Sequence, residues 1–165
     1  LSSHKKGWDD RWKEFSDYAD RGQAMMKEML ALVDEDTNAF NLIMAAFGLP
    51  KGNEEEKAAR KLAIEAATIT AIKVPYRTME LAFQSFDLAK AMAEKGNPNS
   101  VSDAGVAALC ARTAVKGAYL NVIINAQDLK EHPEVKPLVE KAIAMSETAD
   151  TREKEIMEIV VSKIK

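Results

Sequence analysis

Asp36 is an acidic residue in an otherwise apolar stripe of the sequence. The members of this stripe follow one another at alternating steps of four and three: Met29, Val33, Asp36, Phe40, Ile43 and Phe47. Such spacing places them along one face of a helix, so we expect Asp36 at a core position. A carboxylate among apolar side chains loses solvation, which raises the pKa of such a group and suits it to transfer protons near neutral pH. The alternative is a carboxylate at the rim of the core that binds a neighbouring helix end.

A second polar feature is the stretch NPNSVSDAG at residues 97–105, which precedes an alanine-rich apolar segment. Ser100 and Asp103 are three residues apart and match a helix-capping pattern. One cap leaves Asn97, Asn99 and Ser102 available for a ligand, and the free N–H groups of a helix N-terminus bind anions and polar groups. We therefore expect this loop to border the largest polar-lined cleft, together with Asp36 and Asn121, whether or not it also caps the helix.

Asn121 and Asn125 interrupt the apolar run AYLNVIINA. Four residues apart, they share one face of a helix. A buried amide without a hydrogen-bond partner costs about 1 to 3 kcal/mol, so the pair is either satisfied inside the core or lines a binding site. The same helix is rich in small residues, which predicts close helix contacts within this chain or with a partner subunit.

Other chemistry finds little support in the sequence. His4 and His132 are isolated and the only cysteine is Cys110, so no pattern of metal ligands and no intramolecular disulfide is present. The chain contains no P-loop, no G-x-G-x-x-G and no G-x-S-x-G motif. We expect neither a metal nor a redox cofactor.

The amino-acid composition is typical of an ordinary globular protein. Its 165 residues carry 26 acidic and 23 basic side chains, a net charge of -3 that provides no general attraction for nucleic acid or anionic lipid. No signal-like start and no charge-free run of 18 apolar residues is visible, so we expect a cytoplasmic protein with no membrane span.

Apolar residues recur at steps of three and four nearly throughout, which predicts helices and no sheet. The expected helices cover residues 8–47, 53–95, 102–127 and 133–165. Pro75 should kink or divide the second, because proline removes one helical hydrogen bond and clashes with the preceding turn. The predicted fold is all-α, an up-and-down bundle of long helices in a single domain of residues 1–165.

Two segments resemble a known family. The run NPNSVSDAGVAALCARTAVKGAYLNVIIN is similar to the hallmark segment of the formiminotransferase-cyclodeaminase C-terminal family, which contains formimidoyltetrahydrofolate cyclodeaminases and methenyltetrahydrofolate cyclohydrolases. The likeness continues upstream through LVDEDTNAFNLIMAAFGLPK and so covers essentially the whole chain. It implies a helical bundle that forms a homodimer, with a folate substrate bound near the subunit interface.

The resemblance also implies roles for individual residues. The second Asp of the family's V-D-x-D stretch is its catalytic acid and falls on Asp36. Matching the other motifs implies substrate-binding roles for a set of six residues: Asn97, Ser102, Asp103, Tyr119, Asn121 and Asn125. Family members normally begin with a glycine-rich P-G-G-G-S segment and a small-residue helix, and neither precedes the matching part of this sequence.

The implied reaction closes the ring of 5-formiminotetrahydrofolate to 5,10-methenyltetrahydrofolate with loss of ammonia, using one carboxylate as base and then as acid. Two alternatives stay open. A methenyltetrahydrofolate cyclohydrolase would use the same pocket to add water, and a non-catalytic interaction domain would hold the same polar residues as satisfied core. A formiminotransferase, fused or separate, is an expected partner of the cyclodeaminase.

Overall fold

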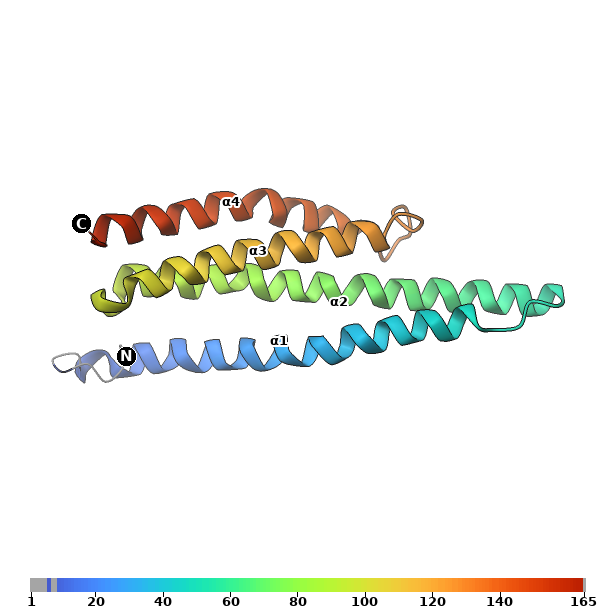
Figure 1. Ribbon diagram of the computed structural model, residues 1–165, viewed down its shortest axis with the longest axis horizontal. Coiled ribbons are helices and arrows are strands. Elements are labelled where there is room, and N and C mark those ends of the chain that lie inside the picture. The colour runs from blue at the N-terminus through green and yellow to red at the C-terminus, as the bar shows by residue number, and fades with distance from the viewer. Residues whose placement is uncertain (1–5, 7–8, 165) are drawn as a thin grey trace.

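The computed structural model describes residues 6 and 9–164, and within them the chain is helical with no strand (Figure 1). Two short 3-10 turns, η1 (Asp9–Arg11) and η2 (Pro98–Ser100), precede long helices. The long helices are α1 (Trp12–Phe47), α2 (Glu54–Lys95), α3 (Val101–Asn125) and α4 (Lys136–Ile164). The all-α prediction is confirmed, with ends that differ from the expected ones by a few residues.

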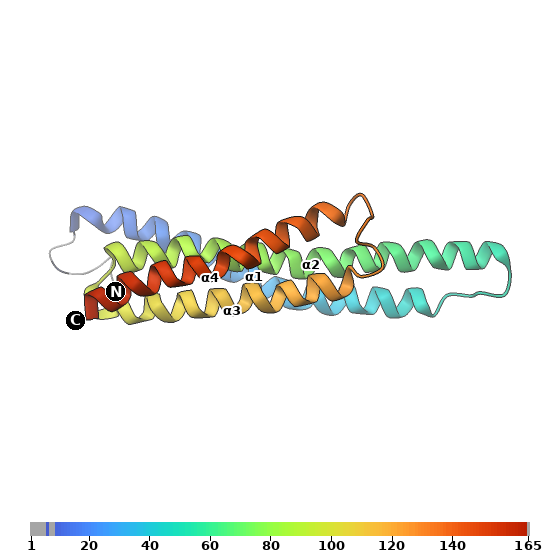
Figure 2. The ribbon, with the colours of Figure 1, turned by 90° about the horizontal axis from the view of Figure 1, so that it is seen from above.

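The helices run up and down, and α2 is the element on which the others assemble. It packs against α1 on one side and against α3 and α4 on the other, while α3 and α4 also pack together. Figures 1 and 2 show that α1 lies along α2 and that the turn between them projects beyond the ends of α3 and α4. Because α1 packs chiefly on α2, much of its remaining surface stays open.

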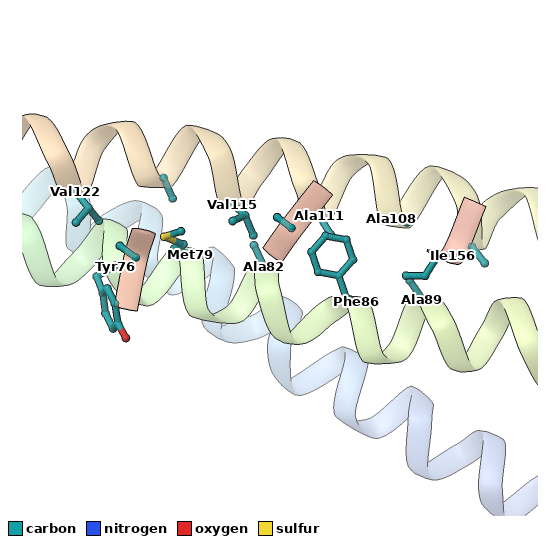
Figure 3. Packing of buried hydrophobic residues seen from close by; sticks show 14 of the residues in the cluster. Tyr76, Met79, Ala82, Phe86, Ala89, Ala108, Ala111, Val115, Val122 and Ile156 are labelled. Carbon is teal, nitrogen blue, oxygen red and sulfur yellow. The ribbon is translucent and has the colours of Figure 1, made fainter. Parts of the chain in front are cut away.

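The hydrophobic core has two parts. The larger lies between α2, α3 and α4 and includes Phe86, Met79, Val115 and Ile156, all fully buried (Figure 3). The alanines of α3 that Figure 3 labels face this core, so small side chains let the helices approach closely, as expected. The smaller part joins α1 to α2 through a set of five buried residues: Leu32, Ala39, Ala71, Val74 and Leu81.

Pro75 lies inside α2 without dividing it. Proline has no N–H, so the carbonyl of Ala71, four residues earlier, loses its helical donor. The side-chain amide of Asn125 on α3 supplies the missing hydrogen bond, with Nδ2 2.8 Å from the Ala71 oxygen. The irregularity in one helix is thus compensated by an amide from its neighbour.

Both ends of α2 are held by specific contacts. Asn53 caps its start by accepting a hydrogen bond from the Glu56 N–H at 2.8 Å. At its end, the Lys163 ammonium on α4 donates to the carbonyls of Ala93 and Glu94 at 2.7 and 2.6 Å. These contacts satisfy backbone groups that a helix end leaves unpaired and fix the point from which the 97–103 loop departs.

Two helices expose apolar faces. On α1 the exposed side chains include Met26, Leu30, Val33, Phe40 and Phe47. On α3 they are Val106, Leu109, Leu120 and Ile124. Among the described residues, one segment, Pro98–Asn125, could cross a membrane as judged by length and composition alone. Core helices of bundles meet the same criterion, and α3 packs along both α2 and α4.

Candidate functional site

A large cavity of the described chain lies at the end of the bundle where α2 passes into α3. Its volume is about 520 Å³, and it opens between the start of α1, the end of α2 and the start of α3. Its wall is largely apolar, with polar groups from Tyr18, Ser85, Asn97, Ser100 and Asp103. An apolar cavity with a few converging polar groups is typical of a small-molecule site.

The 97–103 loop forms one wall of this cavity through Asn97 and Asp103. The Asn97 side chain accepts a hydrogen bond from the Asn99 N–H at 3.2 Å and so caps the short η2 turn. Ser100 makes no side-chain capping bond at the start of α3, so the predicted capping pattern is wrong. Ser100 is the last residue of η2 and also the N-cap residue of α3, so the chain passes from one helical turn directly into the next. Ser102 is exposed and does not line the cavity.

Asp36 lies in the middle of α1 and is exposed, so the expected core position is wrong for a single chain. Val33 and Phe40 of its stripe are open as well, 63% and 60% exposed, whereas Met29 and Ile43 of the same stripe pack against the cluster between α1 and α2. The reason is that α1 buries an adjacent stripe, which contains Leu32 and Ala39, against α2. A helix with two neighbouring apolar stripes has more apolar surface than one partner helix covers.

One chain does not bring Asp36 to the 97–103 loop. Tyr18, on α1, lines the cavity beside the loop, and Asp36 follows 18 residues later on the same helix. At the α-helical rise, these two positions are separated by about 27 Å along the axis. The predicted site residues therefore form two groups in a single subunit.

The second group is made by Tyr119, Asn121 and Asn125, near the end of α3. It lies at the same level of the bundle as Asp36, because Asn125 binds Ala71 and Ala71 packs in the cluster that includes Ala39 of α1. Asn121 is exposed and donates only to the Gly117 carbonyl of its own helix, at 3.3 Å. Its amide oxygen has no hydrogen-bond donor among the described residues and stays available for a ligand or a partner subunit.

Tyr119 and Asn125 both contact neighbouring parts of the fold. Tyr119 is half-buried and packs against the core between α2 and α3. Asn125 donates to the carbonyl that Pro75 leaves open, a hydrogen bond that the satisfied-core alternative expects. Asn121 is exposed and Asn125 is half-buried, so the core does not enclose the two asparagines as a pair, because this face of α3 is only partly covered.

Sequence reasoning did not single out Tyr18 and Ser85, which line the large cavity. Neither belongs to a motif, and only the packing of α1 along α2 brings them together. It also did not single out Tyr76, where burial first and the nearby Glu80 carboxylate second raise the pKa to about 12. Within the described range, no group of three or more His, Cys, Asp or Glu is arranged to hold a metal ion.

The helical bundle with its open α1 face and polar 97–103 loop has a known counterpart. The family profile described as Formiminotransferase-cyclodeaminase matches residues 1–144. The chain belongs to this family, and the resemblance noted in the sequence is confirmed.

The named relatives include both a cyclohydrolase and cyclodeaminases. A methenyltetrahydrofolate cyclohydrolase from Methylorubrum extorquens is 33% identical over 99% of this chain and 79% of its own length. A formimidoyltransferase-cyclodeaminase from Rattus norvegicus is 35% identical over 66% of this chain, which spans only 20% of that longer protein. The crystal structure of a formiminotetrahydrofolate cyclodeaminase from Thermotoga maritima superposes with a TM-score of 0.76 at 24% identity, covering 96% of this chain and 76% of that one, and shows the same fold.

Proposed function

We propose that this protein is a formimidoyltetrahydrofolate cyclodeaminase in which Asp36 is the catalytic acid and base. The observation that carries the proposal is the V-D-x-D stretch of a chain in this family, with its second Asp on an open apolar face of α1. Apolar side chains on both sides of a carboxylate provide a surface for a flat aromatic ligand and leave the carboxylate facing it. A relative named as a methenyltetrahydrofolate cyclohydrolase supports the substrate class.

The reaction needs one group that accepts and then returns a proton. Bound as its formamidinium cation, 5-formiminotetrahydrofolate pairs with a carboxylate. Its anilino nitrogen N10 attacks the formimino carbon and forms the new C–N bond while the N10 proton passes to the carboxylate of Asp36. The carboxyl group returns that proton to the formimino nitrogen, the old C–N bond breaks, and ammonia leaves. The product, 5,10-methenyltetrahydrofolate, keeps the positive charge, so atoms and charge balance.

We further propose that the complete site forms between two subunits of a homodimer. Asp36 and the 97–103 loop lie about 27 Å apart along the axis of one chain, too far for one pterin, whereas a two-fold axis can bring one subunit's loop to the other's Asp36. The open apolar faces of α1 and α3 are surfaces that such a dimer would cover. Closure would also desolvate Asp36 and exclude water from the reactive carbon.

In this dimer, the polar loop residues Asn97, Ser102 and Asp103 would bind the edge of the pterin. Asn121 would reach the substrate with its available amide oxygen. Hydrogen bonds of this kind hold N10 and the formimino carbon close enough to react. Tyr119 and Asn125 would act by fixing the position of α3 on α2.

The cyclohydrolase is the second candidate, favoured by the relative that matches nearly the whole chain. In that reaction Asp36 takes a proton from water as the oxygen adds to the methenyl carbon. Opening of the ring then gives formyltetrahydrofolate and a proton. The same carboxylate and the same pocket would serve, because both reactions pass through a tetrahedral carbon between N5 and N10.

The deciding experiment supplies each folate separately to the purified protein. Ammonia release together with formation of the methenyl chromophore from 5-formiminotetrahydrofolate identifies the cyclodeaminase. Loss of the chromophore from added 5,10-methenyltetrahydrofolate without ammonia identifies the cyclohydrolase. A folded protein that binds neither folate would refute both and leave a non-catalytic interaction domain.

A further inference from the structure

A second cavity lies at the turn between α1 and α2, and its lining is basic. Its volume is about 350 Å³, with walls formed by Lys51, Lys57, Arg60, Lys61 and Ile64. The turn projects beyond α3 and α4 (Figures 1 and 2), and no residue of these two helices lines the cavity. Four cationic side chains around one cavity attract anions in spite of the negative net charge of the chain.

Two of these cations are already engaged. The Lys57 ammonium pairs with the Glu54 carboxylate at 2.7 Å. The Arg60 guanidinium donates to the Phe47 carbonyl at 3.2 Å and lies over the Phe47 ring, 5.5 Å from its centroid. Arg60 therefore joins the cavity to the last turn of α1.

The other two cations remain available for a ligand. Lys51 and Lys61 are exposed, and neither forms an ion pair within the described part of the chain. The nearby Glu56 carboxylate is occupied by the Gly52 N–H at 2.7 Å. An incoming carboxylate would thus meet two ammonium groups that form no ion pair within the described part of the chain.

The basic cavity lies at the C-terminal end of the stripe of α1 that contains Asp36. Phe40 and Phe47 are 60% and 52% exposed and follow Asp36 on the same stripe of α1. The eleven residues from Asp36 to Phe47 make three helical turns plus about 20°, so both side chains point in nearly the same direction, about 16 Å apart along the axis. The Asp36 carboxylate, the exposed rings of Phe40 and Phe47 and the basic cavity therefore follow one another along one face of the α1–α2 hairpin.

We propose that Lys51 and Lys61 bind the carboxylates of the glutamate tail of the folate substrate. A folate presents its groups in the matching order: the one-carbon nitrogens, a flat aminobenzoyl ring, then glutamate carboxylates. With the reacting carbon at Asp36, the ring lies over Phe40 and the tail reaches the tip of the hairpin. This assignment rests on the proposed function, from which it takes the class of substrate.

Direct binding tests the tail site without any turnover. The probe is p-aminobenzoyl-triglutamate, titrated by calorimetry into the wild-type protein and into Lys51→Gln/Lys61→Gln. Two partly exposed ion pairs predict dissociation constants about 5- to 30-fold higher for the double variant. Lys130→Gln/Lys141→Gln, exposed lysines elsewhere that carry the same change of charge, should leave the affinity unchanged.

The proposed tail site is refuted if the wild type does not bind the triglutamate or if the Lys130→Gln/Lys141→Gln control weakens binding equally. It is also refuted if tripolyphosphate binds as well as the triglutamate does. The kinetic arm uses folate substrates with one and three glutamates, for which the Lys51/Lys61 variant should raise KM and spare kcat. A wild type that binds the triglutamate through these lysines but converts neither folate refutes the proposed reaction and leaves the tail site standing.

Discussion

The compensation of Pro75 by Asn125 predicts a specific coupling between two helices. In Asn125→Ala the Ala71 carbonyl loses its 2.8 Å hydrogen bond and has no helical donor to replace it. Ala71 is only 8% exposed, so water replaces the bond poorly. Leaving a buried acceptor unpaired costs about 1 to 3 kcal/mol, which in a domain of this size lowers Tm by roughly 2 to 12 °C.

Restoring the N–H at position 75 should remove most of that cost. In Pro75→Ala the new backbone N–H can donate to the Ala71 carbonyl within α2. Adding Asn125→Ala to this background should then cost about 0.5 kcal/mol or less, which gives a coupling energy of about 0.5 to 3 kcal/mol. The double-mutant cycle cancels whatever packing Pro75→Ala itself loses.

The assay is urea unfolding followed by circular dichroism on all four proteins at one protein concentration, because dimerisation would make stability depend on concentration. Asn121→Ala is the matched control, since its amide is exposed and bonds only within α3, and it should change stability by less than about 0.5 kcal/mol. Equal costs of Asn125→Ala in the wild-type and Pro75→Ala backgrounds would refute the compensation.

Three further predictions concern catalysis, assembly and pH. Asp36→Asn should lower the single-turnover rate by about 100- to 10,000-fold while Tm changes little, because asparagine keeps the size of aspartate but cannot transfer the proton; Asp34→Asn is its control, and full activity in Asp36→Asn would exclude the mechanism. Gly117→Trp should convert a dimer to a monomer in sedimentation with the helical circular dichroism retained, because among the described residues no atom outside the adjoining backbone of α3 lies within 4 Å of an added Cβ there; a dimer that persists would exclude this face of α3 from the interface. The raised pKa of Tyr76, about 12 against an ordinary 10.0, means that its proton stabilises the fold below pH 10 and that this contribution is lost as the pH rises through 12. In Tyr76→Phe the free energy of unfolding should therefore fall less steeply between pH 10 and 12 than in the wild type. An unchanged slope would assign the pH dependence to other groups.

The four long helices and the all-α class follow from the sequence because they depend on local information. Apolar periodicity gives the helices, and Gly, Pro and acidic residues mark their ends, as Asn53 and the acids after it do for α2. The family resemblance likewise rests on short runs of residues and required no coordinates. Asp36 could be assigned to an apolar stripe of α1 in the same way.

Only tertiary packing determines which apolar stripe of α1 is covered. Periodicity shows that Val33, Asp36 and Phe40 share a face, but α1 uses the neighbouring stripe with Leu32 to contact α2, and one helix partner cannot cover both. The partner of Asn125 is equally invisible in the sequence, because a carbonyl freed by Pro75 on another helix is 54 positions away along the chain. Local pattern fixes where a side chain points on its own helix, whereas its burial and hydrogen bonds depend on surfaces that only the folded chain, or a second subunit, brings against it.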